Sequence, residues 1–127
     1  MNLNSILIGS EDPKRLADYY TKLFGEPGWN EGGYTGWQIG SGAVTVGPHD
    51  QVTGSNAQPG RLIWNIETTD VQGDFDRMKA AGAIVVREPY AFEMPEGEVR
   101  EGASPPSSIA TLADPDDNYF QLVSPMI

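Results

Sequence analysis

Few side chains in this 127-residue sequence could carry out chemistry on a substrate. The chain has no Cys, which excludes disulfides, thiolate metal sites and thiol catalysis. Its single His, His49, lies in Gly47-Pro48-His49-Asp50, just past a predicted strand, and this context favours an exposed turn. One His also excludes a metal site built from two His and one carboxylate. The sequence therefore predicts no metal and no cofactor.

The charge of the chain restricts its partners. Asp and Glu number 18 against 8 Lys and Arg, so the formal net charge is -10. This charge repels phosphate backbones and anionic membranes, which excludes nucleic acid as a partner. It favours either a cationic ligand or simple solubility. Without a signal segment or an apolar run long enough to span a bilayer, we expect a cytoplasmic protein with no membrane partner.

The first part of the chain predicts one helix among short strands. Residues 4–9 form an apolar, β-prone run, and Asp12 is an expected N-cap before a helix-compatible proline. Apolar residues then recur at helical spacing until Gly25, which ends the helix. A turn at 40–42 precedes a strand at 43–46.

The same pattern restarts after a polar segment rich in Gly and Pro. Residues 61–67 predict a strand, Asp70 a second N-cap, and Gly82 the end of a second helix. Residues 83–86 predict the next strand. When Asp12 is aligned with Asp70, the two helix ends fall within one residue of each other. This is an internal repeat of two βαβββ copies.

One long segment departs from the repeat. Residues 93–108 contain several Pro, Gly and Glu and few apolar side chains, so we expect an exposed loop. A loop of this kind is either a lid over a pocket or simply mobile. The sequence leaves both possibilities open.

A predicted hairpin at residues 110–125 carries a family resemblance. Asp114-Pro115-Asp116-Asp117-Asn118 is dense in turn-forming residues and runs into the β-prone segment Tyr119-Phe120-Gln121-Leu122-Val123. This pattern resembles the closing hairpin of the glyoxalase/bleomycin-resistance group, the vicinal oxygen chelate superfamily. In that superfamily the position of Gln121 usually holds a metal-binding Glu.

The resemblance implies an α+β fold. In the superfamily, each βαβββ module curls its sheet into half of an open barrel, with helices outside and a pocket in the concave face. We therefore expect a single domain over 1–127, with module one at about 1–50, a linker at about 51–60, and module two at about 61–127.

The resemblance also locates the family's metal site, in the first and last strands of each module. None of the four positions holds His, Asp or Glu, and shifting the alignment by one residue does not restore a ligand set. In lacking these metal ligands, the chain resembles the metal-free bleomycin-resistance type of the superfamily. The four positions are Ser5, Thr45, Ile63 and Gln121.

Strand alternation then predicts which side chains line the pocket. Successive residues of a strand point to opposite faces of the sheet. If Asn65 and Glu67 point toward the concave face, the alternate residues lie under the helix. These are Leu62, Trp64 and Ile66. Aromatic residues such as Trp29, Tyr34 and Trp37 are either pocket lining or core, and alternation does not decide the side of Trp37. The predicted ligand-binding residues are Ser5, Leu7, Trp37, Thr45, Asn65, Glu67, Tyr119 and Gln121.

Two functions follow from this lining. The first is a metal-independent protein that binds a small molecule, sequestering a cationic or aromatic ligand, and forms a homodimer as superfamily members often do. The alternative is a metal-independent lyase or isomerase in which Glu67 is the base, because Glu67 is the only plausible base in the set. The sequence leaves open whether the protein is an enzyme.

Overall fold

The computed structural model describes residues 1–92 and 107–125. The predicted loop at 93–108, and with it the predicted lid, lies almost entirely outside the described residues. Its last two residues are an exception, because Ser107 and Ser108 already pair with Phe92 and Ala91 of the preceding strand. The predicted bound at residue 108 is therefore wrong, because the next strand already begins at Ser107.

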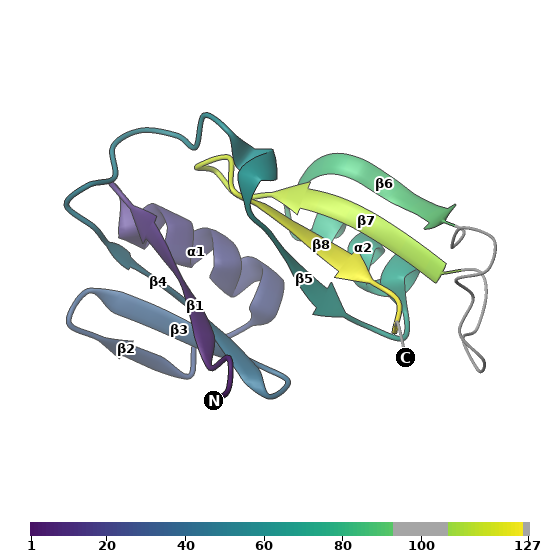
Figure 1. Ribbon diagram of the computed structural model, residues 1–127, viewed down its shortest axis with the longest axis horizontal. Coiled ribbons are helices and arrows are strands. Elements are labelled where there is room, and N and C mark those ends of the chain that lie inside the picture. The colour runs from purple at the N-terminus through teal and green to yellow at the C-terminus, as the bar shows by residue number, and fades with distance from the viewer. Residues whose placement is uncertain (93–106, 126–127) are drawn as a thin grey trace. The chain divides into compact units, whose positions relative to one another are not determined.

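Module one is a four-stranded sheet with one helix (Figure 1). The sheet order is β1-β4-β3-β2, in which β1 and β4 are parallel and the other pairs are antiparallel. The elements are β1 (Ser5–Ser10), α1 (Pro13–Phe24), β2 (Trp29–Glu31), β3 (Tyr34–Ile39) and β4 (Gly42–Pro48).

Module two repeats this arrangement, with the equivalent strand order β5-β8-β7-β6 and a parallel β5–β8 pair (Figure 1). This confirms the predicted α+β class and the two βαβββ modules. The elements are η1 (Pro59–Arg61), β5 (Ile63–Glu67), α2 (Val71–Ala80), β6 (Ile84–Phe92), β7 (Ser107–Ala113) and β8 (Tyr119–Val123).

Both helices begin at the predicted caps. A side-chain oxygen of Asp12 accepts from the backbone N–H of Arg15 at 3.2 Å, and that of Asp70 accepts from Gly73 at 2.9 Å. Each bond satisfies an amide that lacks a partner within its helix. Gly25 then ends α1 with a φ of 88°, which is accessible to Gly at little cost. Within the described residues, neither helix is both long and apolar enough to cross a membrane.

The core of module one lies between α1 and one side of its sheet. Tyr20 is fully buried on α1, and its ring lies 6.1 Å from that of Trp37 on β3. Val44, the register partner of Trp37, is buried on the same side. The apolar stripe of α1 therefore covers the side of the sheet that carries Trp37 and Val44.

The core of module two is built in the same way. Phe75 and Met78 of α2 are buried, as are Phe120 and Leu122 of β8. Trp64 is half-buried and stacks on Phe120 with ring centroids 5.0 Å apart, so it lies on the helix-facing side predicted for it. The prediction for Leu62 is wrong, because β5 begins only at Ile63. Leu62 caps the preceding 3-10 turn and is 69% exposed.

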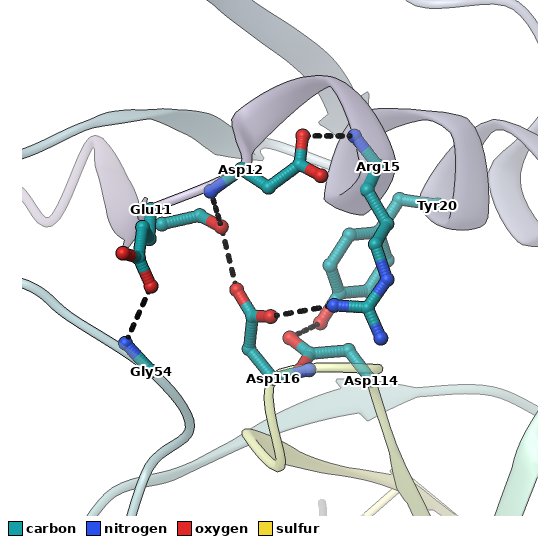
Figure 2. Close-up of polar contacts among 8 residues, drawn as sticks. Glu11, Asp12, Arg15, Tyr20, Gly54, Asp114 and Asp116 are labelled. Atoms are coloured by element: carbon teal, nitrogen blue, oxygen red, sulfur yellow. Dashed lines mark hydrogen bonds and ion pairs between the residues drawn. The ribbon is translucent and has the colours of Figure 1, made fainter.

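The chain forms two compact units. They match the two modules except for one short segment. The first unit is Met1–Ala57 with Asp114–Asp117, and the second is Gln58–Ala113 with Asn118–Ile127. The turn between β7 and β8 is thus part of the first unit. Its contacts with β1, α1 and the segment after β4 explain this assignment, and Figure 2 shows those with Tyr20 and Arg15 of α1.

The first of these contacts is a buried hydrogen bond. The Tyr20 hydroxyl donates to Asp114 Oδ2 at 2.7 Å, and both residues have 0% exposure. The other Asp114 oxygen accepts from the backbone N–H of Asp116 at 2.8 Å. Burial, followed by the charge of Asp114, raises the pKa of Tyr20 well above its usual range. The hydroxyl therefore keeps its proton and remains a donor.

Asp116 makes further contacts, and Figure 2 shows the one with Arg15. Its side chain accepts from Ser10 Oγ at 2.6 Å and lies 3.4 Å from the Arg15 guanidinium, while its carbonyl accepts from Asn56 N–H at 2.8 Å. The predicted turn residues thus do more than reverse the chain, since they complete the polar interior of the first unit.

Candidate functional site

Three of the predicted ligand-binding residues share one side of the module-one sheet. Because Val44 and Val46 of β4 face α1, Thr45 between them points to the opposite side. The parallel register places Leu7 beside Thr45, and Ser5 lies two residues before Leu7 on the same side. We call this helix-free side the first open face. Leu7 is 56% exposed on it.

Two aromatic rings also lie on the first open face. A Cβ added to Gly36 would meet the Trp29 indole at 1.9 Å, so the indole lies directly over this glycine. The Tyr34 ring covers Gly47 in the same way. Trp29 and Tyr34 remain 39% and 38% exposed. The face therefore presents two flat rings that small glycines allow to lie against the sheet.

Trp37 lies on the other side of this sheet. It is 2% exposed, and its Nε1 donates to the Gly25 carbonyl at 2.9 Å. The structure therefore does not bring it together with Ser5, Leu7 and Thr45. Its ring belongs to the core beneath α1, because its register partner Val44 is a helix-facing residue.

The other four predicted residues share the helix-free side of the module-two sheet, the second open face. Asn65 is the register partner of Gln121, and Glu67 and Tyr119 lie two residues away from this pair, on β5 and β8. Gln121 Nε2 donates to Thr111 Oγ1 of β7 at 3.1 Å. The structure thus places amide, hydroxyl, carboxylate and phenol groups on one face.

Glu67 is the only carboxylate among the predicted site residues. It is exposed at the end of β5, opposite Val123. In the described part of the chain, no side chain makes a hydrogen bond or ion pair with it. A solvated carboxylate of this kind can pair with a ligand cation, but no neighbouring group orients it as a base.

A continuous row of register partners crosses each open face. In module one the row is Leu7, Thr45, Gly36 and Trp29. In module two it is Asn65, Gln121, Thr111 and Arg87. We call these the apolar row and the polar row. Sequence reasoning missed Arg87 and Thr111, and it left Trp29 undecided.

Arg87 reaches the second open face through irregularities in β6. The pairing of β6 with β7 shifts between Val85 and Arg87, and again between Arg87 and Tyr90. In a regular strand, residues three apart point to opposite sides of the sheet. Because of the second shift, Arg87 pairs with Thr111 and Tyr90 pairs with Ile109. Arg87 and Tyr90 therefore point to the same side of the sheet. The Arg87 guanidinium then lies 3.5 Å from the centre of the Tyr90 ring. Pro89 was the available signal of a bulge.

The superfamily's metal site does not fit the residues present. Its four positions hold two hydroxyls, an alkyl side chain and an amide, at Ser5, Thr45, Ile63 and Gln121. Neutral oxygens of this kind are poor ligands for zinc, nickel or iron. Among residues 1–92 and 107–125, no three or more His, Cys, Asp or Glu side chains form a cluster that could hold a metal ion.

Comparison with known proteins identifies the family. The sequence matches the glyoxalase-like domain family over residues 5–123. Among curated proteins, none matches the chain. Solved structures that share the fold include a glyoxalase-related enzyme from Fulvimarina pelagi, which is 18% identical with a TM-score of 0.68 and covers 98% of this chain and 88% of its own.

Two further structures are similar. A glyoxalase/bleomycin resistance protein/dioxygenase family enzyme from Burkholderia phytofirmans PsJN is 17% identical, with a TM-score of 0.70 and 98% coverage of both chains. A glyoxalase/bleomycin resistance protein from Albidiferax ferrireducens T118 is 19% identical, with a TM-score of 0.66 and coverage of 97% and 98%. At these identities the likeness shows the fold alone. The family match spans nearly the whole sequence, which confirms the predicted superfamily, and the chain therefore belongs to the glyoxalase-like domain family.

Proposed function

We propose that this chain is a metal-independent small-molecule binding protein of the glyoxalase/bleomycin-resistance type, which sequesters an aromatic or cationic ligand without changing it. The observation that carries the proposal is the composition of the two open faces. They present exposed rings and neutral hydrogen-bonding groups at and around the four positions where the superfamily holds a metal. Such a lining orients a ligand and supplies little for catalysis.

The open faces support both parts of this ligand class. Trp29 and Tyr34 offer flat apolar surfaces to an aromatic group. Glu67 offers an exposed carboxylate to a cation, and the formal net charge of -10 attracts cations to the protein as a whole. Both interactions strengthen binding without requiring a reaction.

The test uses (2-naphthylmethyl)ammonium, an aromatic cation. We expect it to quench tryptophan emission, to raise the melting temperature as its concentration rises, and to be recovered unchanged. Glu67→Gln should weaken its binding by roughly 1 to 3 kcal/mol, the scale of a lost charge-assisted hydrogen bond. Glu88→Gln is the matched control, because the Glu88 carboxylate pairs with Lys79 at 3.2 Å. Binding should also survive a chelator, and the washed protein should contain no stoichiometric zinc, nickel or iron.

The alternative is a metal-independent lyase or isomerase with Glu67 as base. It is favoured by the position of this carboxylate beside Asn65 and Gln121, which could orient a substrate. In that case Glu67→Gln would preserve binding and reduce turnover by about two to four orders of magnitude. A product that disappears in this variant would overturn the binding-protein proposal.

We further propose that the protein is a homodimer. Leu7, Trp29 and Tyr34 leave exposed apolar surface on one sheet face, and such surface is commonly covered by a second copy or a ligand. Light scattering at micromolar concentration should give twice the chain mass of 13.8 kDa. A monomeric mass would contradict this proposal and leave the binding proposal standing.

A further inference from the structure

Arg87 has an unusual environment for a cation in an acidic chain. Four basic side chains, Lys14, Arg15, Arg77 and Lys79, lie within 4 Å of a carboxylate. Lys22, Arg61 and Arg87 do not, as far as residues 1–92 and 107–125 show. Of these three, Arg87 is the one that lies on the second open face. Its guanidinium lies instead on the face of the Tyr90 ring, at 3.5 Å from the centroid.

Two described carboxylates, Glu88 and Glu67, lie on the strands of this sheet and do not pair with Arg87. Glu88, next in sequence, pairs with Lys79 of α2, which draws its side chain toward the helix side. Glu67 lies on β5, at the opposite edge of the sheet from β6. With strands about 4.8 Å apart, the backbones of these two strands are separated by about 14 Å, well beyond a Debye length. Within the described residues no carboxylate pairs with Arg87, so its positive charge is available to a ligand.

The geometry also prepares Arg87 for a planar acceptor. A guanidinium stacked on a ring keeps its N–H edge free, and its fork of donors matches the two oxygens of a carboxylate. Thr111, its register partner, accepts from Gln121 Nε2, so the side chains behind Arg87 are held by a hydrogen bond. The bulge that aligns Arg87 with Tyr90 thus produces a preformed donor at one end of the polar row.

We propose that the polar row binds the carboxylate of an aromatic acid, with Arg87 as the residue that holds the carboxylate. This inference rests on the proposed ligand binding. It adds a carboxylate to the ligand, which neither the net charge of the protein nor its exposed rings predict. The net charge of -10 opposes ligands with several negative charges, so the ligand carries a single carboxylate. Tyr90 holds the guanidinium in place and is a positioning residue.

The experiment compares three probes that share one ring system: 2-naphthoate, neutral 2-naphthamide and (2-naphthylmethyl)ammonium. Their affinities are measured by calorimetry for the wild type, Arg87→Gln, Arg87→Lys and Arg77→Gln. The last is the matched control, because Arg77 lies on α2 of the same module and its loss changes the net charge equally. Melting temperatures establish that each variant is folded.

We expect Arg87→Gln to weaken naphthoate binding by roughly 10-fold to 100-fold and to leave the amide and the ammonium unchanged. The naphthoate affinity of Arg87→Lys should lie between those of the wild type and Arg87→Gln. Lysine keeps the positive charge but lacks the two parallel N–H donors of the guanidinium. Equal naphthoate affinities in Arg87→Gln and Arg77→Gln would overturn the inference. If the amide and ammonium bind while naphthoate does not, the inference fails and the proposed function stands; if no probe binds, both fail.

Discussion

Replacing Tyr20 with Phe should lower the free energy of unfolding by about 1.5 to 3 kcal/mol, the range for a hydrogen bond to a charged group. The phenyl ring fills the same space between α1 and the sheet, so the change isolates the hydroxyl. Asp114 then loses the hydroxyl donor while it still accepts from the backbone N–H of Asp116, in a site with 0% exposure. A buried carboxylate that loses a donor is costly, because water cannot replace it.

The difference in the free energy of unfolding between the wild type and Tyr20→Phe should also become smaller at alkaline pH. The pKa of Tyr20 is raised by burial and by Asp114, so the folded state keeps a proton that the unfolded chain releases above about pH 10. Stability from this group is therefore present below pH 10 and is lost as the pH rises. At pH 11 the wild type should therefore have lost stability that the variant does not lose.

Denaturant unfolding at pH 7 and pH 11 measures both effects. Tyr34→Phe is the control, because Tyr34 is 38% exposed and its ring, not its hydroxyl, contacts Gly47. We expect this variant to differ from wild type by less than about 0.5 kcal/mol at pH 7. Similar losses in the two variants would show that the Tyr20–Asp114 bond has no special role.

Replacing Gly36 with Ala should remove the aromatic surface of the first open face. The new methyl group would lie 1.9 Å from the Trp29 indole, so the ring must leave the sheet. We expect Trp29 to become more exposed, its emission to shift to the red, and affinity for 2-naphthamide to fall about tenfold, equivalent to about 1.4 kcal/mol. A neutral probe is chosen so that ion pairing does not contribute to the measured affinity.

Gly42→Ala provides the matched control in the same sheet. A Cβ at Gly42 would lie 3.8 Å from the Asn4 carbonyl, an ordinary contact that requires no movement. Emission and affinity should therefore match the wild type. If Gly36→Ala also matches the wild type in affinity, Trp29 does not contact the probe, and the aromatic part of the proposal must be relocated.

Local signals in the sequence were sufficient to predict most of the architecture. Asp12 and Asp70 were recognised as N-caps because each precedes a stretch with apolar residues at helical spacing. A short acidic side chain at that position commonly accepts a hydrogen bond from an amide of the first helical turn. Their equivalent spacing to the helix ends revealed the repeat. The open-face positions of Thr45, Asn65 and Gln121 followed from alternation, which holds wherever a strand is regular.

The residues that sequence reasoning missed depend on irregular or distant pairing. Alternation cannot place Arg87, because the bulges of β6 change the side on which it points. Trp37 gave no local sign that the Gly25 carbonyl, beyond the end of α1, would accept from its indole. The partners of Asp114 and Asp116 lie about a hundred positions earlier, and no periodic pattern connects them.

The placement of the Asp114–Asp117 turn in the first unit has a consequence for synthesis of the chain. A ribosome that adds roughly 5 to 20 residues per second reaches Asp117 several seconds after Ala57. During that interval the nascent first unit lacks the acceptors for Ser10 and Tyr20. We therefore expect the first unit to remain incompletely ordered until the turn emerges, rather than to complete its fold before the second unit is synthesised.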